Sequence, residues 1–157
     1  MSSRLPSITT EYAWRDCYSI GNTIIDQQHK KLLMLCAKSA KCLENRSPES
    51  HERFHDLLNE MAVCAREHFA KEEELLLARH YPKLAEHAEE HKLFHIALSD
   101  FLFSAMEGKQ DRLGVFSFLS EWWVHHILVS DWDCRSYLAD RCQQQPRTDP
   151  FAEETST

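Results

Sequence analysis

Residues 68–95 read HFAKEEELLLARHYPKLAEHAEEHKLFH, and this stretch decides the fold class. Side chains four residues apart lie about 40° from each other around an α-helix. His68 and Glu72 therefore share one helix face, which also carries apolar side chains. The residue before a proline avoids the α-helical conformation, so the Tyr81-Pro82 pair predicts a break. The stretch thus indicates two helices joined by a short turn, with polar groups on an apolar face.

The same alternation of long periodic segments and short breaks continues outward in both directions. Glycine occurs only 3 times, and the 5 prolines lie outside the periodic segments or at their edges. Asp26 is a plausible N-cap for the first helix, and Ser47 followed by Pro48 is typical of a cap and first turn. Apolar residues at spacings of three and four predict helices at about 26–44, 48–80, 82–106 and 112–140. Four such helices with short links favour an all-α fold, an antiparallel up-down-up-down four-helix bundle.

The chain is predicted to form one domain with two appendages. Its 157 residues suit a single core, and 43% hydrophobic with 27% charged residues is a globular composition. We expect a single domain over 1–142, with an N-terminal arm before about Ile24 that Trp14 and Tyr18 anchor. Residues 143–157 carry turn formers and charge without any period, so we expect a mobile C-terminal tail.

Composition excludes several classes of function. A net charge of -7 offers no basic face to a phosphate backbone, so no nucleic-acid partner is expected. No segment approaches the ~20 apolar residues of a membrane span, and the first residues lack the apolar stretch of a secretory signal. We therefore expect no membrane partner and a cytoplasmic location. The 6 cysteines form no CxxC pair and are interpreted as buried thiols. A monomer is expected, with a weak or Cys142-linked dimer as the alternative.

Histidine is the anomaly of the composition, since the chain has 10. Imidazoles and carboxylates on apolar helix faces would cost several kcal/mol each unless they are hydrogen-bonded, paired or bound to metal. His126 lies within an apolar run of the fourth helix, and Asp131 follows it by five residues. The candidate ligands, drawn from all four helices, are His29, His68, Glu72, His87, His91, His126 and Asp131. They exceed what one tetrahedral zinc accepts and suit two octahedral ions that share bridging carboxylates.

At these residues the sequence resembles the hemerythrin family, and in particular its bacterial single-domain members. The resemblance covers roughly residues 14–137. It depends on four pieces in the family's order: IDQQHK at 25–30, His68-Phe69 followed by Glu72, Tyr81-Pro82 leading to His87 and His91, and Trp122 four residues before His126, then Ile127 and Asp131.

The resemblance implies a role for each candidate. His87, His91 and His126 would bind one iron ion, and His29 with His68 the other. Glu72 and Asp131 would bridge the two ions together with an oxo or hydroxo ligand. The second iron keeps an open position for dioxygen, and Ile127 would line the oxygen pocket.

The expected function is accordingly reversible dioxygen binding, as a carrier or store and not as an enzyme. One alternative is an oxygen or redox sensor that uses the same di-iron site. An oxidoreductase that consumes peroxide or nitric oxide is a third interpretation. The stretch HAEEH also matches an H-x-x-E-H zinc peptidase pattern with Glu90 as the base. We disfavour a peptidase because it needs a larger scaffold and leaves His29, His68 and His126 unexplained.

The remaining histidines and one cysteine serve as points of comparison. His51 and His55 fall on the outer side of the second helix and are interpreted as solvated. His95 extends the His87 and His91 series by one turn and is expected at the rim of the site. Cys134 stands where the resemblance leads us to expect a tyrosine.

Overall fold

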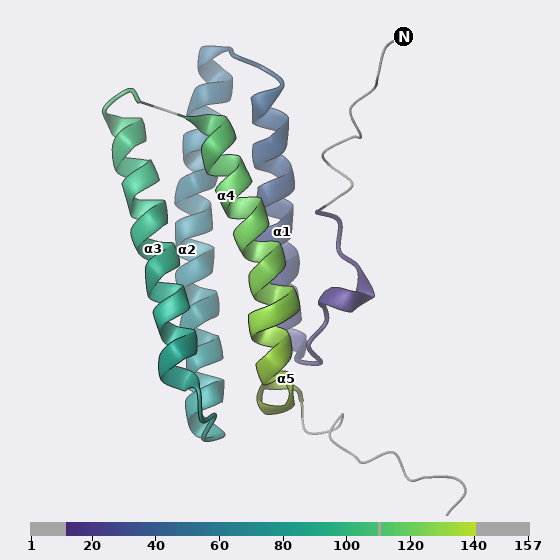
Figure 1. Ribbon diagram of the computed structural model, residues 1–157. Helices are drawn as coiled ribbons and strands as arrows, with labels where there is room; N and C mark the ends of the chain where they lie inside the picture. The colour runs from purple at the N-terminus through teal and green to yellow at the C-terminus, as the bar shows by residue number, and fades with distance from the viewer. Residues whose placement is uncertain (1–11, 110, 141–157) are drawn as a thin grey trace, which may run out of the picture.

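The computed structural model describes residues 12–109 and 111–140, and every regular element in this part of the chain is helical. Figure 1 shows the long helices of the bundle side by side, linked by short turns. The elements are η2 (Asp16–Tyr18), α1 (Thr23–Leu43), α2 (Pro48–Ala78), α3 (Leu84–Met106), α4 (Arg112–His125), η3 (His126–Asp131) and α5 (Trp132–Leu138). The predicted all-α four-helix bundle is confirmed. We call its four helical segments columns: α1, α2 and α3 each form one, and α4, η3 and α5 together form the fourth. The predicted mobile tail lies outside the described residues.

The first helix begins earlier than predicted. Asn22 is its N-cap, and the Asn22 side-chain oxygen accepts hydrogen bonds from two backbone amides of the first turn. The prediction of Asp26 as the cap was wrong because that carboxylate has other partners. It accepts hydrogen bonds from Ser19 Oγ at 2.6 Å and Ile20 N at 2.9 Å. Asp26 therefore ties the N-terminal arm to α1.

The turn after α2 explains how the second and third columns become antiparallel. His80 has a φ of 56°. The amide of His80 bonds to the Leu77 carbonyl at 3.1 Å, and the amide of Tyr81 bonds to the Leu76 carbonyl at 2.9 Å. These two bonds form a Schellman motif, which stops a helix and satisfies its last carbonyls. Leu84 then opens α3, two residues later than predicted.

The fourth column corrects the prediction of one regular helix over 112–140. Residues His126–Asp131 form a π-helical turn, in which each amide bonds to the carbonyl five residues earlier. In a regular α-helix, residues five apart lie about 140° from each other around the axis. The wider π-helical turn reduces that angle, so His126 and Asp131 can both face the bundle interior.

Two apolar clusters fill the bundle. The larger one includes Phe54, Leu58, Phe69, Trp123 and Ile127, and the smaller one comprises Ile20, Ile25, Leu76, Cys134 and Leu138. Along α1 and α2 the polar candidate residues lie between these clusters, which makes a polar layer inside an apolar core.

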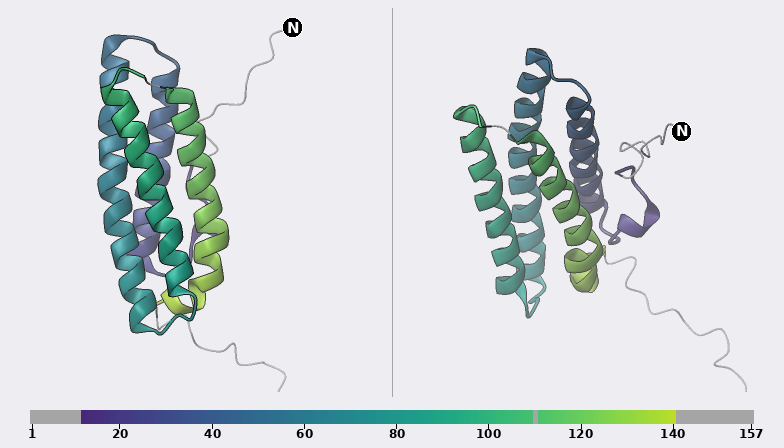
Figure 2. Two further views of the ribbon diagram at one scale, coloured as in Figure 1. Left: turned by 60° about the vertical axis from the view of Figure 1, so that its left-hand side comes forward. Right: turned by 45° about the horizontal axis from the view of Figure 1, so that its top comes forward.

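The arm packs as predicted, since Tyr18 belongs to the larger cluster and Trp14 contacts it. Lys30 Nζ lies 4.7 Å from the centre of the Trp14 ring. Figure 2 shows the described part of the arm, residues 12–22, beside α1. None of the described helices is long and apolar enough to cross a membrane.

Candidate metal centre

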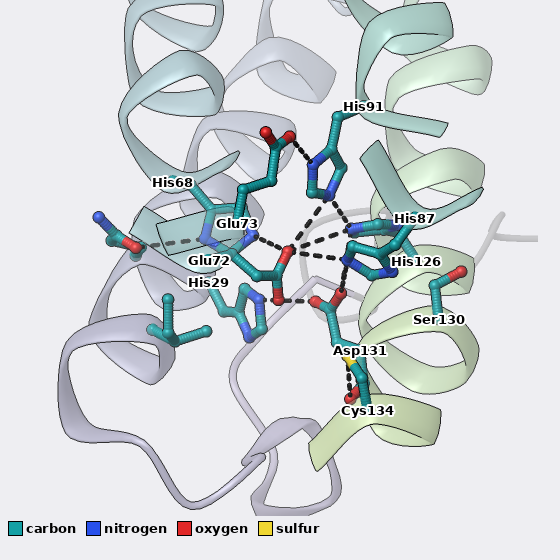
Figure 3. A network of polar contacts seen from close by, with 12 residues as sticks. His29, His68, Glu72, Glu73, His87, His91, His126, Ser130, Asp131 and Cys134 are labelled. Carbon is teal, nitrogen blue, oxygen red and sulfur yellow. Dashed lines mark hydrogen bonds and ion pairs between the residues drawn. The ribbon is translucent and has the colours of Figure 1, made fainter. Parts of the chain in front are cut away.

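The structure brings all seven predicted ligand residues to one place in the interior (Figure 3). Each of these side chains is at most 4% exposed. They come from α1 (His29), α2 (His68, Glu72), α3 (His87, His91) and η3 (His126, Asp131). Five imidazoles and two carboxylates therefore share one water-poor volume.

One half of the cluster is built around Glu72 Oε2. This oxygen lies 3.1 Å from His87 Nε2 and 3.2 Å from His91 Nε2. His91 Nε2 also lies 3.1 Å from His126 Nε2. Ligands at right angles on an ion, each bound at about 2.1 Å, are about 3 Å apart. Three of these separations thus match that spacing, Glu72 Oε2 lies 3.8 Å from His126 Nε2, and ligand atoms of the four residues lie within 4.8 Å of one another, so one ion could contact all four.

The other half involves His29 and His68, and both carboxylates connect it to the first half. Asp131 Oδ2 lies 3.0 Å from His29 Nε2, while Asp131 Oδ1 lies 3.0 Å from His126 Nε2. Glu72 Oε2 lies 3.8 Å from His68 Nε2. Each carboxylate thus contacts imidazoles of both halves, as a bridging ligand must.

Several of these buried atoms have no hydrogen-bond partner among the described residues, namely both ring nitrogens of His29, His68 Nε2, Glu72 Oε1 and both oxygens of Asp131. His29 Nε2 and Asp131 Oδ2 are near each other without the geometry of a hydrogen bond. An unsatisfied buried acceptor costs roughly 1–3 kcal/mol, and more when it is charged. A cation within the cluster would satisfy these atoms together, so the donor set fits a metal centre.

The electrostatics favour the metal-binding forms of the side chains. Burial lowers the pKa of His68 to about 3, so its ring is neutral at pH 7 and offers a lone pair. Burial would raise the pKa of Glu72, but the imidazoles of His126, His87 and His91 hold it well below its usual range. Burial likewise opposes ionisation of Asp131, yet His126 and His29 help to keep its pKa at about 2. Both carboxylates are therefore ionised at neutral pH.

His126 differs from His68 because its ring is charged in the absence of metal. Burial would lower the pKa of His126, but Asp131, Glu72 and Glu90 raise it well above its ordinary value. A proton on His126 Nε2 thus partly neutralises the two carboxylates. A metal ion would take the place of this proton, so metal binding releases it.

Three further residues hydrogen-bond to ligand imidazoles at Nδ1, the ring nitrogen that faces away from the cluster. The sequence did not predict these three residues. His68 Nδ1 lies 3.2 Å from Gln28 Oε1, and His91 Nδ1 lies 2.7 Å from Glu73 Oε1. His126 Nδ1 lies 3.3 Å from Glu90 Oε2. Glu90, the base of the disfavoured peptidase pattern, is therefore a hydrogen-bond partner of an imidazole on another column. Glu73 directly follows a predicted ligand, but adjacency in sequence does not predict a bond to α3.

The comparison residues lie away from the ligand set or at its edge. His51 is exposed and His55 is partly exposed on α2. His95 is half-buried, and its ring centroid lies 5.2 Å from that of Phe69 in a T-shaped arrangement. Cys134 is buried, and its thiol donates to the Asp131 carbonyl at 3.4 Å. Ile127 is 1% exposed, in the apolar cluster next to His126.

Comparison with known proteins identifies the family. Residues 21–131 match the family described as the Hemerythrin HHE cation binding domain, which covers most of the chain. The chain belongs to the hemerythrin family. The predicted family membership is thus confirmed, and all seven candidate ligands fall within the matched range.

Individual hemerythrins show the same relationship over nearly their whole length. The chain is 28% identical to a bacteriohemerythrin of Clostridium acetobutylicum over 130 residues, which cover 81% of this chain and 98% of that protein. It is 26% identical to the myohemerythrin of Riftia pachyptila over 138 residues, which cover 88% of this chain and 100% of that protein. It is 27% identical to the hemerythrin of Themiste dyscrita over 135 residues, 83% of this chain and 97% of that protein.

Proposed function

We propose that this hemerythrin binds dioxygen reversibly at a non-haem di-iron centre and serves as an oxygen carrier or store. One observation carries the proposal: seven buried side chains from all four columns converge, with imidazole nitrogens and unpaired carboxylate oxygens facing one volume. Membership of a cation-binding family supports it.

The two halves of the cluster suggest the ligand sets. His87, His91 and His126 would hold one iron ion, and His29 with His68 would hold the other. Glu72 and Asp131, which lie near imidazoles of both halves, would be shared by the two ions together with one oxo or hydroxo ligand. When bound, the iron pair supplies two electrons and one open coordination position for dioxygen on the two-histidine side.

The chain contributes a low charge and an apolar enclosure. Two Fe²⁺ ions, two carboxylates and one hydroxide sum to a charge of about +1, which a buried site tolerates far better than the bare ions. Phe69, Trp123 and Ile127 are buried in the adjoining apolar cluster and keep water away from the ligands. We assign Ile127 to the wall of the oxygen pocket.

Binding rather than catalysis follows from the balance of ligands. Carboxylate-rich di-iron bundles use Glu-x-x-His at a spacing of three, whereas here five imidazoles accompany two carboxylates. We infer that the imidazole-rich set favours release of unchanged dioxygen. Multiple turnovers of peroxide, nitric oxide or an added substrate in the presence of a reductant would contradict this part of the proposal.

The test is an anaerobic iron titration followed by exposure to oxygen. Iron is counted per chain after desalting, and optical spectra are recorded before air, after air and after removal of oxygen. We expect two irons per chain and a charge-transfer band that appears with oxygen and disappears without it.

His95 provides a matched control for the metal ligands. It follows His91 by one turn of α3 but is half-buried and outside the ligand set. We expect His91→Ala to abolish the oxygen-dependent band and His95→Ala to preserve it. Equal iron content and equal spectra in the two variants would overturn the proposed site.

A further inference from the structure

The outer nitrogens of the ligand imidazoles are held differently in the two halves of the centre. In the three-histidine half, two rings meet glutamates: His91 Nδ1 lies 2.7 Å from Glu73 Oε1, and His126 Nδ1 lies 3.3 Å from Glu90 Oε2. Ser130 Oγ donates to the same Glu90 oxygen at 2.7 Å and fixes its position. Two carboxylates, each with a negative charge, therefore lie next to Nδ1 atoms of the three-histidine half.

The two-histidine half has no such charge. His68 Nδ1 lies 3.2 Å from the amide oxygen of Gln28, which is neutral. His29 Nδ1 is buried and has no hydrogen-bond partner among the described residues. The protein thus places carboxylates behind one set of ligands and at most an amide behind the other.

A carboxylate at this position changes what the opposite ring nitrogen offers. An ionised carboxylate only accepts hydrogen bonds, so Nδ1 of His91 and of His126 must carry a proton. Once a metal ion replaces the proton on His126 Nε2, Nε2 of both rings can present its lone pair inward. An anionic acceptor on Nδ1–H also makes the imidazole a stronger electron donor. Stronger donation stabilises Fe³⁺ relative to Fe²⁺ at the ion that the imidazole binds.

The rings are fixed independently of these hydrogen bonds. The Phe69 ring stacks on His91 at 3.9 Å between centroids and 9° between planes. The Trp122 ring stacks on His126 at 4.4 Å and 17°. Because stacking already sets the ring orientation, the glutamates act mainly through charge, and removing that charge should leave the ligand geometry in place.

We propose that Glu73 and Glu90 act through His91 and His126 to lower the reduction potential of the iron that these two histidines hold with His87. This iron is then oxidised first. The inference depends on the proposed di-iron centre and deepens it. It gives the two ions unequal roles: the three-histidine ion loses its electron first, and the two-histidine ion, on the oxygen-binding side, stays ferrous longer.

The test compares neutralised glutamates with matched neighbours. Glu73→Gln and Glu90→Gln remove the charges, while Glu74→Gln and Glu89→Gln make the same change one residue away. The two control glutamates pair with Lys71 at 3.0 Å and Lys92 at 3.1 Å, on the surface. Iron content is measured first, and the two one-electron potentials are then measured by anaerobic spectroelectrochemical titration.

We expect each of the two test variants to raise the first potential by about 59 mV, which corresponds to about a tenfold change in the ratio of oxidised to reduced iron. The controls should match the native protein. Gln28→Glu should do the reverse in the other half, by lowering the second potential and narrowing the gap between the two steps.

The outcomes separate this inference from the proposed function. A native chain that retained no iron pair would overturn both. Full iron content with the same first potential in the Glu73, Glu90, Glu74 and Glu89 variants would overturn the inference alone. Iron loss from Glu73→Gln or Glu90→Gln would also count against it, because those residues would then retain the metal rather than adjust its potential.

Discussion

The two ends of the bundle each bury charged groups, but only one end satisfies them with protein atoms. At the end where α1 meets α4, Arg112 is 9% exposed. Arg112 Nη1 donates to the Cys42 carbonyl at 2.8 Å, and Nη2 donates to the Asn45 carbonyl at 3.1 Å. Ser50 Oγ also donates to the Cys42 carbonyl, at 2.9 Å. A guanidinium at the last carbonyls of a helix also suits the helix dipole.

At the other end, the seven-residue cluster leaves ring nitrogens and carboxylate oxygens unpaired within the described chain. The contrast teaches that burial of charge alone does not identify a functional site. Arg112 is buried and hydrogen-bonded to carbonyls of the chain, whereas Glu72 and Asp131 are buried with oxygens that lack a hydrogen-bond partner among the described residues. The end with unpaired buried atoms is therefore the one where we expect a bound metal ion.

Metal removal should give the largest difference in local stability between the two ends of the bundle. A ligand present at about 1,000 times its dissociation constant stabilises the folded state by about 4 kcal/mol. We expect chelation to lower the free energy of unfolding by about that amount, measured by anaerobic chemical denaturation. Hydrogen exchange should accelerate around Glu72 and His91 but not around Arg112. Unchanged hydrogen exchange around Glu72 and His91 after chelation would contradict the proposed difference between the two ends.

Replacing Arg112 with Met should destabilise the protein by about 1–3 kcal/mol, because the Asn45 carbonyl loses its guanidinium donor and the Cys42 carbonyl keeps only Ser50. The loss should be the same with and without iron, since none of the candidate metal ligands among the described residues lies at this end. The measurement is the denaturation midpoint of the variant in both forms. A loss that appears only in the iron-loaded form would show that the two ends are coupled.

Replacing Glu72 with Met should also destabilise the metal-free protein, by about 1–3 kcal/mol, because the buried rings of His87 and His91 lose the oxygen that they contact. Removing one partner of a buried pair leaves the other partner uncompensated. We expect the variant to be less stable than the native chain after chelation, measured by chemical denaturation, and to retain no iron pair. A metal-free variant more stable than the native chain would show that burying the carboxylate costs more than its imidazole contacts return.

Ser50→Ala should give the smallest effect, a loss of about 0.5–1 kcal/mol. Its hydroxyl donates to Cys42 and accepts from Arg112 Nη1 at 3.3 Å, but the guanidinium keeps its carbonyl partners. Denaturation of the variant beside Arg112→Met measures how much of the local stability the arginine supplies alone. Equal losses in the two variants would mean that the serine, not the arginine, completes this end.

The four helices and the clustering of the candidate ligands could be predicted from the sequence for a simple physical reason. Apolar side chains at helical spacing define buried faces, and His29, His68 and Glu72 on those faces are costly unless something binds them. Asp131 was a candidate from its place five residues after His126, although that distance does not fit a regular helix face, and the family resemblance implied its bridging role.

What the sequence did not predict depends on contacts between distant segments. Asn22 and Asp26 are both good capping residues, and only the arm, through Ser19 and Ile20, decides which of them caps α1. Glu73 and Glu90 sit at positions that would suit solvent, and their partners lie on other columns. A π-helical turn has no hydrophobic period of its own, so η3 could not be predicted from spacing.

The widened turn at His126–Asp131 also affects how relatives should be compared. A relative that kept the five-residue spacing but formed a regular α-helix there would keep every residue type, yet its aspartate would lie about 140° from its histidine around the helix axis. Counting histidines and carboxylates would then report a complete site in a protein unable to assemble one. The backbone conformation between these two candidate ligands is therefore as diagnostic as their identities.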